Sequence, residues 1–202
     1  MIHHYEFTTA VEDSAGSADG ALVNGAEVTN GLLVLDGIDD YVQFPEHLIP
    51  LGGDFTVAFV ARQTAPQAGE FVELISQGFS TGPGFYLGHH LDGTIRAGDS
   101  WQDTGVDFPA DGRIHHYALV ANASDDLTYL YIDGQLRATH NTAISSTGEG
   151  THTRLGSQFD TGGIDLEWFH GQMDDVRIYD VALNANEIWL LANIFRDGFE
   201  QD

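Results

Sequence analysis

The sequence predicts an all-β sandwich with a short C-terminal helix. Short alternating or apolar runs recur along the 202 residues, and dipeptides of the Asp-Gly and Asn-Gly type separate them. These dipeptides supply the positive φ angles that tight hairpins require, and the chain contains 24 glycines. Many short strands joined by frequent turns are typical of a sandwich of two sheets.

The expected strands are the runs in which β-branched, aromatic and leucine side chains concentrate. Alternation gives such a run one face for the core and one for solvent or a covering loop. The runs are Leu32 to Leu35, Tyr41 to Phe44, Phe55 to Ala61, Phe71 to Ile75, Phe85 to Leu87, His116 to Ala121, Thr128 to Ile132 and Val176 to Tyr179.

A helical pattern is found from Asn184 to Asn193. Asn184 is a good N-cap residue, and Glu187 three positions later completes a capping box. Residues 194–202 are expected to form a tail beyond the domain. The apolar stripe of the helix consists of Ile188, Trp189 and Leu191.

The composition excludes several partners. The chain has 31 acidic residues against seven basic ones, all of them arginine, and a net charge of -24. Such a surface repels nucleic acid and anionic lipid. With 42% hydrophobic and 11% aromatic residues the chain has material for one buried core. No apolar run reaches the length of a membrane span, so membrane insertion is not expected.

The last predicted strand carries an acidic residue where an apolar one is expected. Strict alternation puts Val176 and Ile178 on one face with Asp174 at the head of the same row. A core-facing carboxylate costs several kcal/mol unless it is paired. Asp174 should therefore be bound by backbone amides, by an arginine or by a cation.

Seven segments, in this order, resemble the concanavalin A-like, laminin G-like jelly-roll domains. The resemblance covers residues 2–193 and implies two antiparallel sheets stacked as a jelly roll. It also implies a secreted or surface-attached module that binds glycans or proteins and often carries calcium. The segments are Tyr5-Glu-Phe7, Glu12-Asp-Ser-Ala-Gly16, Leu35-Asp-Gly-Ile-Asp-Asp-Tyr-Val42, Phe55-Thr-Val57, His115-His-Tyr-Ala118, Leu130-Tyr-Ile-Asp-Gly134 and Gly171-Gln-Met-Asp-Asp-Val-Arg-Ile-Tyr179.

The same resemblance implies a structural calcium ion between an N-terminal loop and the last strand. By position it implicates Asp13 and Asp174, with Asp36 or Asp39 as further ligands. Two alternatives stay open. Asp36, Asp39 and the neighbouring Asp40 also suit the shaping of a turn, and backbone amides or an arginine could satisfy Asp174.

Aromatic and polar side chains near loops and strand ends are candidates for ligand binding. Exposed rings beside polar groups suit sugar faces or peptides, although Tyr86 and Trp168 would also serve to close the core edge. Trp101 has polar neighbours on both sides and is expected to be exposed. The candidate residues are Tyr86, His89, Arg96, Asp99, Trp101 and Trp168.

Catalysis is not expected from this sequence. Glycoside hydrolysis needs two carboxylates facing one sugar, and the best local candidates are Asp165 and Glu167 in a glycine-rich loop. Two acids in such a loop are more typical of a solvated surface. The predicted function is therefore an extracellular or cell-surface binding module, part of a larger protein, that takes a glycan. An extracellular protein or peptide is the alternative ligand, and polysaccharide cleavage is a third possibility.

Overall fold

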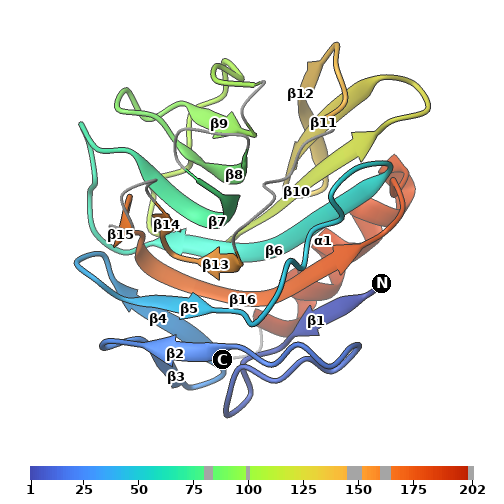
Figure 1. The fold of residues 1–202 in the computed structure, drawn as a ribbon. Coiled ribbons are helices and arrows are strands. Elements are labelled where there is room, and N and C mark those ends of the chain that lie inside the picture. Colours follow the sequence, from blue (N-terminus) through green and yellow to red (C-terminus); the bar gives the residue numbers. More distant parts are fainter. Residues whose placement is uncertain (80–83, 99–100, 145–151, 160–164, 200–202) are drawn as a thin grey trace.

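The computed structural model describes residues 1–79, 84–98, 101–144, 152–159 and 165–199, the last five of these by their backbone only. The described strands form two main antiparallel sheets, as the sequence predicts, with a helix at the C-terminal end (Figure 1). All the runs predicted as strands are strands. The described strands that were not predicted are short, most of them of two or three residues.

The larger sheet brings the two ends of the domain together. Its strand β1 (His3–Tyr5) pairs with β16 (His170–Tyr179), so that Tyr5 lies opposite Val176. Among the described residues the sheet has eight strands. Besides β1 its spatial order is β12 (Gln135–His140), β11 (Leu127–Ile132), β10 (His115–Asn122), β6 (Phe55–Gln63), β16, β4 (Leu32–Asp36) and β3 (Glu27–Thr29).

The smaller sheet covers one face of the larger one. In the described part of the chain it has six strands, and a two-stranded ribbon of β14 (Gln158–Phe159) and β15 (Asp165–Leu166) lies near β7. The order is β2 (Ala21–Val23), β5 (Tyr41–Gln43), β13 (Thr153–Leu155), β7 (Val72–Gly78), β8 (Gly84–His89) and β9 (Ile95–Ala97).

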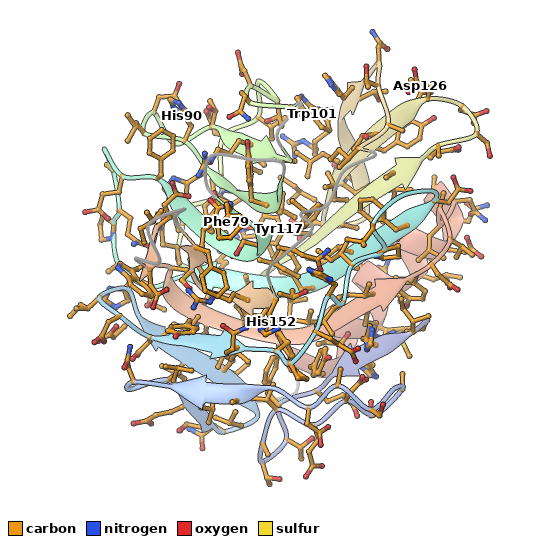
Figure 2. All side chains as sticks on the ribbon, in the orientation of Figure 1. Phe79, His90, Trp101, Tyr117, Asp126 and His152 are labelled. Carbon is orange, nitrogen blue, oxygen red and sulfur yellow. The ribbon has the colours of Figure 1, made fainter. Side chains whose placement is uncertain are left out.

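The main core fills the space between the sheets. Alternation along β6 sends Val57 and Phe59 into this core and Ala58 to the opposite face. Tyr117 stacks on Phe59 with ring centroids 5.5 Å apart, and Figure 2 shows it in the middle of the molecule. The inward faces of both sheets therefore form one continuous apolar layer.

A β-bulge changes the predicted face of Asp174. Asp174 lies opposite Val60, but the next paired residue, Arg177, lies opposite Ala58, and Asp175 between them has a φ of 49°. The extra residue breaks strict alternation. Met173, not Asp174, therefore precedes the core residues of β16, and the prediction that Asp174 heads the core row is wrong.

The helix α1 (Ala185–Phe199) begins as predicted and ends later than predicted. The Oδ1 atom of Asn184 accepts the backbone N–H groups of Asn186 and Glu187, while the Glu187 carboxylate accepts that of Asn184. The helix continues beyond the expected end into the segment predicted as a tail. It lacks the length and apolar character needed to cross a bilayer.

Only part of the expected apolar stripe of α1 is buried. Ile188 and Leu191 pack with Ala118 and Tyr131 in a second cluster on the outer face of the larger sheet. Trp189 is 54% exposed, which corrects the prediction that it belongs to the stripe.

Candidate functional site

Two of the predicted ligand residues, Tyr86 and Arg96, lie in a closed cluster on the outer face of the smaller sheet. The Arg96 guanidinium lies 4.5 Å from the ring of Phe71 and 4.6 Å from that of Tyr86. Its Nη2 also contacts the carboxylates of Glu73 and Glu167. Arg96 and Tyr86 are 7% and 2% exposed, and the guanidinium is already engaged by two carboxylates and two aromatic rings.

Ionising the Glu73 carboxyl group within this cluster is costly. Burial raises its pKa well above the usual range, the nearby Glu167 raises it further, and Arg96 offsets part of the effect. A Cβ atom on Gly88 would lie 2.7 Å from the Glu73 Oε2 and 1.8 Å from the carbonyl oxygen of Val72. Only glycine fits there, and the cluster is a packed structural network.

A second buried arginine, Arg154, also contacts two aromatic rings and a carboxylate. The Arg154 guanidinium lies 4.2 Å from the Tyr41 ring and 3.2 Å from the Phe159 ring, and its Nη1 is 2.6 Å from the Asp165 carboxylate. The half-buried Trp168 packs on Tyr41 with ring centroids 6.0 Å apart. The two carboxylates considered for glycoside hydrolysis, those of Asp165 and Glu167, are thus each paired with a different buried arginine.

Trp101 is buried, contrary to the expected exposure. Its side chain is 5% exposed, and its ring stacks on His140 of β12 at 5.2 Å, in the gap between β9 and β12 (Figure 2). The Ala97 N–H donates to the Trp101 carbonyl at 2.8 Å. The predicted ligand residue Asp99 lies outside the described residues.

The carboxylate of Asp13, a predicted calcium ligand, is already surrounded by donors. Five groups donate to its two oxygens, and its side chain has no exposed surface. Burial alone would raise the pKa of Asp13, but these hydrogen bonds outweigh it and lower the pKa to about 2. The donors are the His3 ring and the backbone N–H groups of His4, Ala15, Gly16 and Ala18.

Asp174 lies on the other flank of β1. The His4 N–H and C=O bind the Asp13 loop, so Asp13 lies along the edge of β1 that faces away from β16. Burial, and then the charge of Asp175, raise the pKa of Asp174 to about 7, although the Asp175 N–H donates to it at 2.7 Å. The predicted pair of calcium ligands is therefore separated by a strand.

The third acidic group is compact and shapes a turn. Oxygen atoms of Asp36, Asp39 and Asp40 lie within 4.8 Å of one another. The buried Asp40 carboxylate accepts the N–H groups of Gly25 at 2.7 Å and Asp36 at 3.0 Å, and Asp36 accepts that of Ile38 at 2.8 Å. These contacts agree with the turn-shaping alternative.

A cavity of about 120 Å³ lies between the C-terminal ends of β6 and β8. His89 is the one predicted ligand residue in its lining. The neighbouring His90, labelled in Figure 2, marks this end of the molecule. The lining residues are Gln63, Pro66, Gln67, Ala68, His89, Gly93, Phe108 and Ala110.

Hydrogen bonds orient the two glutamine amides of this end pocket. The Gln67 Oε1 accepts the backbone N–H of His170 at 2.8 Å, and its Nε2 donates to the carbonyl oxygen of Trp168 at 2.6 Å. The Gln63 Nε2 donates to the Gln67 Oε1 at 3.1 Å. The segment that leads into β16 therefore holds the Gln67 amide, and Gln67 in turn holds the Gln63 amide.

His89 is neutral and takes a single tautomer in this network. Its Nδ1 is 3.1 Å from the His90 carbonyl oxygen, which only accepts, so Nδ1 carries the proton. Its Nε2 then accepts from the Gln63 Nε2 at 3.3 Å. Burial lowers the pKa of His89. The Phe108 ring lies 5.3 Å from the imidazole and provides an apolar wall.

Of these lining residues only His89 was among the predicted ligand residues; Gln63, Gln67 and Phe108 were not. The only available signal was a glutamine at the end of the strongly apolar β6 and a second one four residues later. Nothing in the sequence places Phe108 beside them.

The chain belongs to the concanavalin A-like lectin/glucanases superfamily, whose family model matches residues 36–189. No curated protein matches the chain. Domain 4 of AbnA, an extracellular arabinanase from Geobacillus stearothermophilus solved with arabinotriose, is a similar structure. It has a TM-score of 0.74 and 19% identity, with 95% of this chain and 97% of that domain covered.

Two further solved structures share the fold. The receptor binding domain of botulinum neurotoxin D has a TM-score of 0.72 and 14% identity, with 96% of this chain and 52% of that domain covered. A Trypanosoma rangeli sialidase, solved with 2,3-difluorosialic acid, has a TM-score of 0.70 and 18% identity, with 99% of this chain and 33% of the sialidase covered. The chain thus spans about half of the toxin domain and a third of the sialidase. At these identities the likeness shows the fold alone.

Proposed function

We propose that this domain is a glycan-binding module and that the end pocket is its binding site. The observation that carries the proposal is the oriented set of two amides and a neutral imidazole beside the ring of Phe108. Amides bind sugar hydroxyl groups, and an apolar wall suits the C–H groups of a sugar. In the cluster around Arg96 the guanidinium is instead already paired with Glu73 and Glu167.

The size of the pocket allows at most one sugar unit. Its volume of about 120 Å³ corresponds to roughly four water molecules at liquid density. Pockets for drug-sized ligands start at about 300 Å³. The pocket therefore suits the end of a glycan chain, with the following units lying over the exposed rim of Pro66, Ala68 and Ala110.

Binding without catalysis is the function that the site supports best. No carboxylate is found among the lining residues in the described part of the chain. The paired acids Asp165 and Glu167 are engaged with Arg154 and Arg96. A glycosidase would need two carboxylates facing a sugar.

An extracellular location and a larger parent protein complete this proposal. The arabinanase to which AbnA domain 4 belongs is described as extracellular, and that domain was solved with an oligosaccharide. The net charge of -24 suits a salty exterior that screens carboxylates.

Protein binding is the second candidate function, favoured by an apolar surface on α1. Trp189, Leu190 and Ile194 are each more than half exposed, and so is Leu136 on β12. The botulinum neurotoxin DC binding domain has been solved with rat synaptotagmin II. A partner retained equally by a variant with a closed end pocket would favour this candidate.

Calcium binding remains a prediction, and two of the predicted places fit it poorly. Five N–H donors surround Asp13 and would repel a cation. Asp174 lies across β1 from it. The group of Asp36, Asp39 and Asp40 is the place left to test.

A rim substitution tests the glycan proposal without disturbing the core. Ala110 is exposed and lines the pocket, so Ala110→Tyr should fill its entrance. We expect a loss of about tenfold or more in affinity for glycans that the wild type retains on an array of neutral and acidic glycans. Ala123→Tyr in the turn after β10 is the matched control. A wild type that binds nothing on the array overturns the proposal.

A further inference from the structure

The hydrogen bonds of the end pocket fix which polar atoms remain for a ligand. The His170 N–H can only donate and the Trp168 carbonyl can only accept, so the Gln67 amide has one orientation. Because the Gln67 Oε1 is an acceptor, Gln63 must present its Nε2 to it. The second N–H of Gln63 points to the Nε2 of His89.

Two polar groups are left over from this network. The Oε1 atom of Gln63 has no hydrogen-bond partner among the described residues, and one N–H of the Gln67 Nε2 is likewise unused there. Gln63 and Gln67 both line the pocket. A hydroxyl group complements this pair because it donates to a carbonyl oxygen and accepts from an N–H.

A carboxylate fits the same place poorly. It can only accept hydrogen bonds, so it would face the Gln63 Oε1 without a donor between them. His89 is neutral and supplies no charge, and Arg96, the cation that acts on His89, is already paired with Glu73 and Glu167. The field of a chain with a net charge of -24 adds to the repulsion.

We infer that the end pocket selects neutral, hydroxyl-bearing sugar units and rejects sugars that carry a carboxylate. The inference rests on the proposed function and narrows it.

Matched sugar pairs test the inference directly. The methyl glycosides of glucose, galactose and mannose are titrated against the corresponding uronic acids, which differ only in the oxidation state of C6, with NMR shifts as the readout. We expect at least one neutral glycoside to bind and its acid to bind about tenfold or more weakly. The Ala110→Tyr variant should lose the neutral glycoside.

The outcomes separate the inference from the proposed function. If an acid binds as tightly as its neutral counterpart, and Ala110→Tyr abolishes both, the inference is overturned while the glycan site stands. If no member of any pair binds, the proposed function and the inference fail together.

A charge added at the rim tests the cause of the selectivity. Ala68 is exposed and lines the pocket. Ala68→Arg should reduce the ratio of the affinities for the neutral glycoside and its uronic acid by about threefold or more, because the added guanidinium supplies the missing cation. Ala123→Arg changes the net charge equally, away from the pocket, and should leave the preference unchanged. An equal effect of both variants would show that the local donor pattern is not the cause.

Discussion

Asp13 and Asp174 flank the same short strand, β1, and the sequence suggests the same role for both. In the structure their pKa values are shifted in opposite directions. Five donors hold Asp13 as a carboxylate and lower its pKa to about 2. Asp174 accepts one backbone N–H, lies next to Asp175, and has a pKa raised to about 7.

The difference teaches that burial does not decide the charge of an acid by itself. Burial raises the pKa in both cases. The turn after Asp13 points successive N–H groups at one carboxylate, whereas the bulge at Asp175 places a second carboxylate beside Asp174. Backbone geometry on each flank of β1 therefore decides whether the pKa of the acid is raised or lowered.

Removing the Asp13 carboxylate should give the largest effect. Asp13→Ala leaves several buried N–H groups without an acceptor, so we expect a loss of about 3 kcal/mol in the free energy of unfolding at pH 7, measured by urea denaturation. Because the folded pKa is lowered, this stabilisation is complete above about pH 4 and is lost as the pH falls toward 2. The exposed neighbour Glu12→Ala is the control, and equal losses would contradict the assignment.

Neutralising Asp174 should stabilise the protein, by a smaller amount. The folded pKa of about 7 lies above the unfolded value, so ionisation of Asp174 costs stability as the pH rises from about 4 to 7. Asp174→Asn should therefore gain about 1 kcal/mol at pH 8, a figure reduced for the partial exposure of the side chain, and almost nothing at pH 4. Asp180→Asn, just after β16, is the control. A gain that does not depend on pH would refute this explanation.

Of the changes considered, added calcium should have the smallest effect on stability at either flank of β1. Thermal melting in calcium chloride and in chelator should give the same midpoint, because donors already fill the Asp13 site and β1 separates it from Asp174. A site saturated about a hundredfold would add about 2.7 kcal/mol. A rise of that size, abolished by Asp36→Asn with Asp39→Asn, would instead establish the turn group as a calcium site.

The bulge in β16 shows where prediction from the sequence stopped. Period-2 alternation correctly predicted a strand with Val176 and Ile178 facing the core. It misplaced Asp174 because a single residue with positive φ, Asp175, shifts the faces, and aspartate tolerates that conformation without a glycine to signal it. The predicted exposure of Trp101 was wrong for a related reason. Its polar sequence neighbours do not indicate that its ring stacks on His140, which lies on a distant strand.

The sequence by itself determined the sandwich, its turns and the cap of α1, because these depend on local alternation, on glycine and on one asparagine. The tertiary structure alone decided the end pocket and the charge states around β1. Gln63, His89 and Phe108 come from three separate parts of the chain, and no local pattern records which side chains meet when two sheets close on each other.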